Sequence, residues 1–224
     1  IRGGTYINLF DSPLLLCRNS GLSFEQRLFK RIFDIVVSVI GLIILSPFML
    51  IIAAAIKIDD GGSIIYKQKR LTINGKEFFV YKFRSMIPNA EKNGVPQLAT
   101  GSDSRITRVG KFLRKCRLDE LPQLFNIIKG DMSVVGPRPE RPELTEKYER
   151  EMPEFKFRLK VKAGLTGYAQ VTGVYDTTPY DKLKMDLMYI ERYSMVMDLR
   201  IILMTIKTMI SPGEMNSEAD KEKY

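Results

Sequence analysis

The stretch that decides the fold is residues 35–58, IVVSVIGLIILSPFMLIIAAAIKI, an apolar run interrupted near its middle by Ser46-Pro47. No charged residue lies between Asp34 and Lys57, so the segment belongs either in the hydrocarbon of a membrane or in a deep protein core. At about 1.5 Å of rise per residue, a helix of roughly 22 residues just crosses a bilayer core of about 30 Å. Length alone therefore favours a span.

The charges that flank this run argue against a simple span. Basic residues stand on both sides of it, namely Arg27, Lys30 and Arg31 before it and Lys57, Lys67, Lys69 and Arg70 after it. Because cytoplasmic loops carry the excess of Lys and Arg, both ends are assigned to the cytoplasmic side.

A helix that enters a membrane and returns must break. Pro47 lacks an N–H and clashes with the carbonyl of Ile43, while the hydroxyl of Ser46 can donate to the carbonyl of Leu42. We therefore expect a re-entrant helix-break-helix over about residues 32–58, in which an arm of eleven residues reaches roughly 16 Å. An ordinary kinked span and a buried core helix are the alternatives.

Composition limits the chemistry. The 224 residues include no histidine, which excludes Ser-His and Cys-His nucleophile pairs and imidazole metal ligands. The two cysteines, Cys17 and Cys116, have no metal-binding spacing and fit free thiols in a reducing compartment. The net charge is +9, and residues 57–117 hold fourteen Lys or Arg against five Asp or Glu. This region should attract anions, although a solvated basic face has the same composition.

The remaining pattern predicts an α+β fold, mostly helical with one small β-hairpin. We expect a helix capped by Ser23, hairpin strands over 64–73 and 77–83 joined by Asn74-Gly75, helices from Thr107, from Asp119 to Gly130 and over 142–151, extended segments over 132–135 and 155–162, and a helix through 199–210. The basic amphipathic helix after Thr107 suits a membrane interface or a soluble core.

The domain organisation follows from these elements. Residues 1–24 are predicted to be a linker or the remnant of an upstream domain and 211–224 a charged tail, and the length of the chain suggests one domain or at most two. Because the chain starts at Ile1 rather than Met and shows no cleavable signal peptide, we expect it to be part of something longer.

The pair Asp119-Glu120 is the best candidate for catalysis. A carboxylate at a helix N-terminus is held ionised by the helix dipole, at a place that also attracts phosphate. Neighbouring residues there point in different directions, so one can act as a nucleophile while the other binds a metal. The structural alternative is that Asp119 caps the helix and Glu120 is a first-turn acid.

Several other residues suit phosphate binding. Arg138 lies between two prolines that stiffen the chain, and Lys82 and Arg84 lie at the exit of the hairpin. Residues 164–167, GLTG, could offer backbone N–H groups, although such a sequence is more often a turn. A rigid turn and gatekeeper charges at a strand end are the structural alternatives for the basic residues. Transfer between phosphates with these ligand types predicts Mg²⁺.

Together these segments resemble the monotopic phosphoglycosyl transferases, the bacterial sugar transferase family, over about residues 25–210. The matching motifs run in chain order as Lys30-Arg31-Ile32-Phe33-Asp34, Ser46-Pro47, Tyr81-Lys82-Phe83-Arg84-Ser85-Met86, Arg117-Leu118-Asp119-Glu120-Leu121-Pro122-Gln123, Gly130-Asp131-Met132-Ser133-Val134-Val135-Gly136-Pro137-Arg138-Pro139 and Gly164-Leu165-Thr166-Gly167-Tyr168-Ala169-Gln170-Val171. In that family the Ser-Pro break forms a re-entrant helix that enters and leaves on the cytoplasmic side, and residues 1–22 resemble the junction after an upstream domain in larger members.

The resemblance implies a two-step reaction at the cytoplasmic face of the bacterial inner membrane. The aspartate matching Asp119 attacks the sugar-bearing phosphate of a UDP-sugar, UMP leaves, and a polyprenyl phosphate takes the phosphosugar. Glu120, with Asp119, would hold Mg²⁺. The resemblance assigns substrate binding to Lys82, Arg84, Arg138, Thr166 and Gln170. Two departures, Ala163 for a common Pro and Tyr180 for a common Trp, bear on the sugar pocket only.

Other functions fit parts of the sequence. A one-step transferase would use Asp119 only as a metal ligand, and a basic membrane adaptor would need no catalysis. A nucleic-acid partner is not expected, because no recognised binding module is present and the apolar run would serve no purpose. Membrane lipid is an expected partner, and a homo-oligomer is compatible with the sequence.

Overall fold

In the computed structural model, the described residues are 4–9, 12–17, 22–87, 90, 103–173 and 177–210. They form a mostly helical α+β fold with three two-stranded sheets, as the sequence predicts at that level. The charged tail predicted over 211–224 lies outside the described residues. Two antiparallel strands, β1 (Gly4–Leu9) and β2 (Ser12–Cys17), lie in the segment predicted to be a linker or the remnant of an upstream domain.

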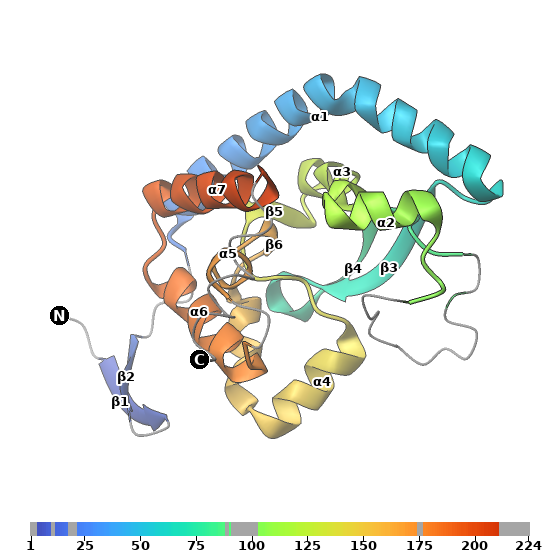
Figure 1. The fold of residues 1–224 in the computed structure, drawn as a ribbon. Helices are drawn as coiled ribbons and strands as arrows, with labels where there is room; N and C mark the ends of the chain where they lie inside the picture. Colours follow the sequence, from blue (N-terminus) through green and yellow to red (C-terminus); the bar gives the residue numbers. More distant parts are fainter. Residues whose placement is uncertain are drawn as a thin grey trace, which may run out of the picture.

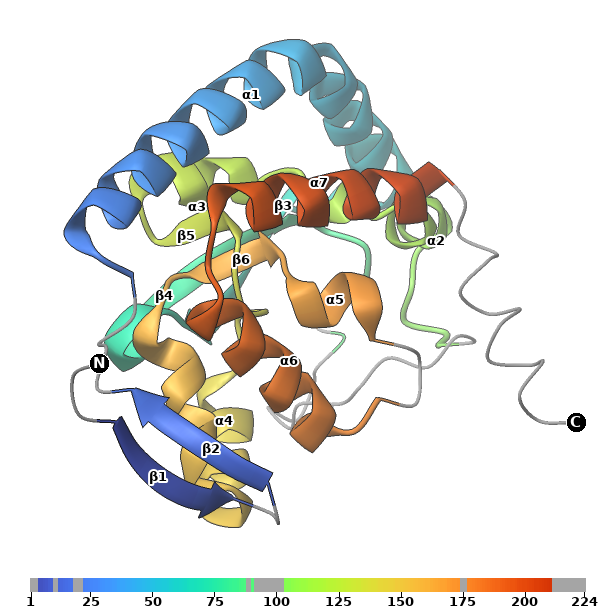
Figure 2. The same ribbon diagram turned by 90° about the vertical axis from the view of Figure 1, so that its left-hand side faces the viewer.

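The long helix α1 (Phe24–Asp60) contains the whole apolar run. It starts with the expected cap, because the Ser23 hydroxyl accepts from the Gln26 N–H and the Gln26 side chain accepts from the Ser23 N–H. The helix continues through Pro47 as one element, and Figures 1 and 2 show it bending so that both ends turn toward the rest of the domain. The expected break is therefore a bend, as a mid-helix proline produces. The Ser46 hydroxyl donates to Ile43 (3.0 Å) and not to Leu42 as predicted, which adds to the disruption of this turn.

The apolar side chains of α1 mostly face outward. Only 11% of the residues in its most apolar 18-residue stretch are buried, and by length and composition the helix is able to cross a membrane. Large exposed side chains along it include Ile43 (69%), Phe48 (62%) and Leu50 (72%). A soluble core helix would bury these groups, so α1 is consistent with membrane association.

The predicted hairpin is confirmed. Strands β3 (Ile65–Leu71) and β4 (Glu77–Phe83) pair antiparallel, with Leu71 opposite Glu77. The turn η1 (Ile73–Gly75) connects them, and both Asn74 (φ 57°) and Gly75 (φ 72°) adopt the left-handed conformation that favours this residue pair.

The remaining elements include the predicted ones, with one change of type, and also three that were not predicted. They are α2 (Arg108–Lys115), η2 (Leu118–Glu120), α3 (Gln123–Lys129), β5 (Met132–Val135), α4 (Pro142–Glu151), η3 (Pro153–Lys160), β6 (Ala163–Thr166), α5 (Tyr168–Thr172), α6 (Pro179–Glu191) and α7 (Met195–Ile210). Of these, β6, α5 and α6 were not predicted. Strands β5 and β6 pair in parallel. Figure 1 shows α2, α3 and α7 close beneath α1, and α4 on the far side of the domain.

The strand predicted over 155–162 is wrong, because this segment forms the 3₁₀ helix η3. The two buried residues of η3, Phe155 and Arg158, are three positions apart, which is the period of a 3₁₀ helix and not of a strand. The Phe155 ring contacts the ring of Tyr148 at 5.0 Å, and Arg158 forms a buried ion pair with Asp186. The alternation of apolar and charged residues suggested that every charged side chain in the segment is exposed, but Arg158 is buried with Asp186.

Two apolar clusters hold these elements together. The larger cluster joins the hairpin, α3 and β5 through buried residues that include Phe78, Val80, Ile127 and Met132. The smaller one lies under the C-terminal arm of α1 and consists of Ile52, Ile56, Phe83 and Leu113. Helix α1 is therefore part of the core that supports the hairpin and α2.

Candidate active site

The candidate catalytic pair lies on the short helix η2. Leu118 and Leu121, three residues apart, both pack against the smaller apolar cluster beneath α1. Side chains at this spacing share one face of a 3₁₀ helix, so the two residues between them, Asp119 and Glu120, are directed elsewhere. The prediction that Asp119 caps α3 is wrong, since that helix begins at Gln123 with Pro122 as its N-cap. Packing of the two leucines favours a separate tight turn.

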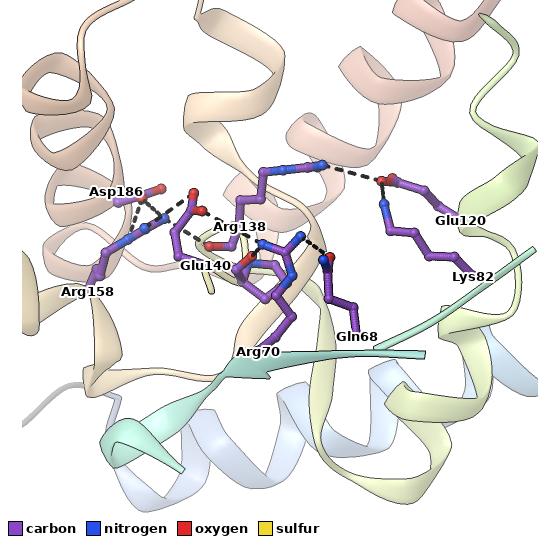
Figure 3. Close-up of polar contacts among 9 residues, drawn as sticks. Gln68, Arg70, Lys82, Glu120, Arg138, Glu140, Arg158 and Asp186 are labelled. Carbon is purple, nitrogen blue, oxygen red and sulfur yellow. Dashed lines mark hydrogen bonds and ion pairs between the residues drawn. The ribbon is translucent and has the colours of Figure 1, made fainter. Parts of the chain in front are cut away.

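Glu120 lies between two cations. Its Oε1 accepts a hydrogen bond from Lys82 Nζ at 2.6 Å and lies 3.5 Å from an Arg138 guanidinium nitrogen (Figure 3). Burial by itself would raise the pKa of the Glu120 carboxyl, but Arg138 and Lys82 outweigh it and hold that pKa at about 2. Glu120 is thus a firmly ionised acid on which the hairpin and the Arg138 loop converge.

The pKa of the Asp119 carboxyl is shifted in the opposite direction. Burial raises the pKa of its carboxyl, and the charge of Glu120 acts in the same direction, while Lys82 and Arg114 only partly oppose them. A carboxylate with a raised pKa is more basic, and basicity favours nucleophilic attack once the group is ionised. The adjacent residues therefore differ in the way that a division between nucleophile and charge-holding acid requires.

The backbone of the Arg138 loop is held by buried arginines. Arg158 donates to the carbonyl of Arg138 at 3.0 Å, and Arg70 donates to the carbonyl of Pro139 at 3.2 Å. Arg158 is itself anchored by Asp186 at 2.7 Å (Figure 3). These bonds fix the loop, so that the half-exposed Arg138 side chain is directed toward Glu120.

Glycines allow this loop to lie directly on β6. A Cβ at Gly136 would meet the carbonyl oxygen of Lys162 at 2.4 Å, and one at Gly164 would meet the nitrogen of Gly136 at 2.1 Å. The Gly164 N–H donates to the carbonyl of Pro137 at 2.9 Å. This N–H is therefore occupied, and the expectation that it is offered to a phosphate is wrong.

A cleft of about 730 Å³ opens beside these residues. Its lining includes eight Lys or Arg and four Asp or Glu: Arg70, Lys82, Arg114, Arg117, Arg138, Arg141, Arg158 and Lys182, with Asp119, Glu120, Glu140 and Asp186. Burial lowers the pKa of Arg70 to about 10, with Arg138 and Arg141 acting in the same direction and Glu140 against them. The cleft thus holds more positive charge than its own carboxylates neutralise, which suits a polyanionic ligand such as a nucleotide diphosphate.

The structure brings five of the predicted site residues together. Lys82, Asp119, Glu120, Arg138 and Gln170 all line the cleft.

Arg84 and Thr166 are not among the residues that line the cleft. The Arg84 guanidinium forms an ion pair with Asp60 at the end of α1 and is buried there. The hydroxyl of Thr166 lies 2.7 Å from that of Thr205 on α7. Both contacts tie the core to helices that have exposed apolar residues.

Sequence reasoning missed Arg70, Arg158 and Asp186. A signal for Arg70 was available, since the register set by the Asn74-Gly75 turn places it on the same face of the hairpin as Lys82. No local signal marks Arg158, because its partner Asp186 is 28 residues away and the segment resembles a strand.

The acids in the cleft suit a hard cation. Within the described residues there is no group of three or more His, Cys, Asp or Glu that would hold a metal by itself. Mg²⁺, however, usually binds through one or two carboxylates together with substrate phosphates and water. The two carboxylates of Asp119 and Glu120, which both line the cationic cleft, fit that pattern.

The chain is similar in sequence to known proteins of one family. The family model described as bacterial sugar transferase matches residues 25–212. The chain is 43% identical over 211 residues to a UDP-glucose:undecaprenyl-phosphate glucose-1-phosphate transferase of Klebsiella pneumoniae, covering 92% of this chain and 43% of that protein. It is 42% identical over 185 residues to a UDP-N-acetylgalactosamine-undecaprenyl-phosphate N-acetylgalactosaminephosphotransferase of Aeromonas hydrophila, covering 81% and 44%.

A shorter relative matches over nearly its whole length. The exopolysaccharide production protein PSS of Rhizobium leguminosarum is 40% identical over 194 residues, which cover 83% of this chain and 96% of that protein. By contrast, the chain spans less than half the length of the Klebsiella and Aeromonas proteins. From the family match over 25–212 and these identities, the chain belongs to the bacterial sugar transferase family.

Proposed function

We propose that this chain transfers a sugar 1-phosphate from a UDP-sugar to a polyprenyl phosphate and releases UMP, as the first membrane step of exopolysaccharide, capsule or other glycan synthesis. The observation that carries the proposal is the pair Asp119 and Glu120, with oppositely shifted pKa values, beside a cationic cleft and joined through a shared core to an exposed apolar helix. The names of the relatives support it, since two describe transfer of a sugar phosphate with undecaprenyl phosphate.

The reaction proceeds in two displacements. An Asp119 oxygen attacks the sugar-bearing phosphorus of the donor, an aspartyl–phosphorus bond forms, and the bond to the bridging oxygen breaks so that UMP leaves with the electron pair. A phosphate oxygen of the polyprenyl acceptor then attacks the same phosphorus and frees the Asp119 carboxylate. No proton is transferred in either step, which fits a chain without histidine.

The cationic side chains stabilise the charge that develops. Lys82 and Arg138 lie beside the pair and are placed to contact the nonbridging phosphate oxygens, while Arg70 and Arg158 hold the loop that carries Arg138. Bound Mg²⁺, held by Glu120 together with Asp119, would neutralise diphosphate charge.

The helix α1 gives the enzyme access to both substrates. We infer that it enters and leaves the bacterial inner membrane on the cytoplasmic side, because the helix bends at Pro47, both of its ends turn toward the catalytic body (Figure 2), and basic residues flank both ends. Exposed apolar side chains on neighbouring helices, Phe112, Phe125, Leu199 and Leu203, extend the lipid-facing surface.

The covalent step is tested by intact mass measurement. The protein is mixed with a UDP-sugar alone, across a set of donors, and separately assayed for UMP release with undecaprenyl phosphate and Mg²⁺. We expect an adduct of one phosphosugar on the unmodified protein and on Asp59→Asn, an exposed control outside the cleft, but none on Asp119→Asn. The one-step alternative would be favoured if UMP is released without any adduct and Asp119→Asn keeps part of this turnover. Absence of UMP release with every donor would refute the transferase proposal.

The topology is tested by labelling from one side of the membrane. Cys17 and Cys116 are replaced by Ser, and single cysteines are introduced at Glu25 and Asp59, one at each end of α1. A reagent that does not cross membranes should reach both positions from the cytoplasmic side only. Labelling of the two positions from opposite sides would show that α1 spans the bilayer.

A further inference from the structure

A second cavity, of about 390 Å³, lies beside the N-terminal arm of α1 and shares no lining residue with the catalytic cleft. Its charged lining consists of Arg27, Lys30, Arg31, Asp34, Lys160 and Lys162. Two segments that are distant in sequence, the start of α1 and residues 160–162, therefore place five cations and a single carboxylate around one space. The first turns of α1 lie against α3 and β5 here (Figure 2).

Part of this charge is neutralised within the protein. Lys30 forms an ion pair with Asp198 at 2.6 Å. The carboxylate of Asp34 accepts hydrogen bonds from the Ser133 hydroxyl (3.0 Å) and the Val134 N–H (2.9 Å), so its Oδ1 is already engaged.

The remaining cations of the cavity are Arg27, Arg31, Lys160 and Lys162. Arg31 donates to the carbonyl oxygens of Ile127 and Ile128 at the end of α3 (2.6 and 2.7 Å), and these two bonds engage two of the five guanidinium N–H donors without cancelling the charge. Among the described residues, no carboxylate forms an ion pair with Arg27, Lys160 or Lys162.

Two of these cations are crowded together. A Cβ at Gly130 would lie 3.4 Å from an Arg31 guanidinium nitrogen and 3.8 Å from Lys162 Nζ, so both groups lie against the same glycine. Burial and the neighbouring Arg31 lower the pKa of Lys162, and Asp34 and Asp131 only partly oppose this. Adjacent, partly desolvated cations of this kind are stabilised by an anion that contacts both.

We propose that this cavity binds the phosphate headgroup of an anionic membrane phospholipid, with Arg31 and Lys162 at its centre and Arg27 and Lys160 at its rim. Phosphate is the class of anion that the Arg and Lys donors recognise. A lipid is its source because the α1 residues of the cavity immediately precede the apolar run, at the level where headgroups lie. The inference rests on the membrane insertion of α1 proposed above, and the bound lipid would fix the depth of its first arm.

The test compares three proteins reconstituted in nanodiscs of phosphatidylcholine with a minor fraction of phosphatidylglycerol. They are the unmodified chain, Lys160→Gln with Lys162→Gln, and a control with the same loss of charge, Lys147→Gln with Lys156→Gln, at exposed positions outside both cavities. Phosphatidylglycerol retained after mild detergent extraction is counted by native mass spectrometry. At about 1 kcal/mol per cation, or roughly 5-fold, the paired change should weaken retention about 25-fold. Arg27→Gln, at an exposed position, provides a second variant that keeps the core intact.

The outcomes separate the proposals. The lipid site is supported if the unmodified chain and the control retain phosphatidylglycerol strongly while the Lys160/Lys162 variant and Arg27→Gln lose it. Equal retention by all proteins overturns it. A thermal shift assay with inorganic phosphate tests the source of the phosphate. If phosphate stabilises the unmodified chain but not the Lys160/Lys162 variant, and no lipid is retained, the ligand is not a lipid and the lipid source is overturned. Flotation with vesicles of phosphatidylcholine alone tests the insertion of α1 separately, and UMP release tests the catalytic proposal.

Discussion

The charge on Glu120 should be one of the larger single electrostatic contributions to the stability of this fold. The pKa of its carboxyl falls from 4.5 to about 2 through Arg138 and Lys82, in spite of burial. A difference of about 2.5 pKa units, at about 1.36 kcal/mol per unit, corresponds to about 3 kcal/mol. The Arg138 side chain is 45% exposed, so water screens part of this interaction. We therefore expect Glu120→Gln to lower the free energy of unfolding at pH 7 by about 2 kcal/mol.

The pH dependence has a definite sign. Because the folded pKa lies below the unfolded one, the ionised carboxylate stabilises the fold fully above pH 4.5, and this stabilisation is lost as the pH falls toward 2. The difference in stability between the unmodified protein and Glu120→Gln should therefore shrink over that interval. It should be constant between pH 6 and 8.

The assay is urea unfolding of the detergent-solubilised protein, followed by tyrosine fluorescence, since the chain has ten tyrosines and no tryptophan. Glu77→Gln is the matched control, because Glu77 pairs with Lys69 in water, with both side chains about half exposed. It should cost less than about 1 kcal/mol. Equal effects of the two substitutions, or a Glu120→Gln effect that does not change between pH 7 and 3, would refute the charge cluster described here.

Three further predictions concern residues that support the site. Asn126→Ala should cost about 2–4 kcal/mol in urea unfolding, because the buried amide of Asn126 bonds both an N–H and a carbonyl of β4 and leaves them unsatisfied when removed. Gly136→Ala should lower the free energy of unfolding by about 1–3 kcal/mol in the same assay, since its Cβ would meet backbone at 2.4 Å. Arg158→Lys should reduce kcat/KM for UMP release by roughly 10- to 100-fold, because lysine keeps the charge but lacks the planar fork that holds both Asp186 and the Arg138 carbonyl.

The regular elements could be predicted because their signals are local. The apolar run, the Asn74-Gly75 turn and the Ser23 cap each act within a few residues, and each appears where the sequence places it. The segment 155–162 shows the limit. Its alternating residues fit a strand, but burial of Arg158 against Asp186 on α6 favours the three-residue period of η3. That contact is set by tertiary packing and has no local signature.

The candidate site was predictable to the extent that its motifs lie next to each other in space. Lys82, Glu120 and Arg138 come from three separate motifs and meet at one carboxylate oxygen. Arg84 comes from the same motif as Lys82 but pairs with Asp60, because α1 ends above the hairpin exit and leaves an acid there. Motif membership therefore identified the segment, while the packing of α1 decided which of its two cations faces the cleft.

The opposite behaviour of Asp119 and Glu120 follows from one packing constraint. Leu118 and Leu121 are held under the second arm of α1, so the two acids between them must leave the same short turn in different directions. Among the described residues, Lys82 and Arg138 then form ion pairs with Glu120, while Asp119 is partly buried beside a carboxylate. Pairs of acids whose environments separate their pKa values mark a division of catalytic roles. It follows that a change in how α1 packs on these two leucines would act directly on the turn that carries both acids.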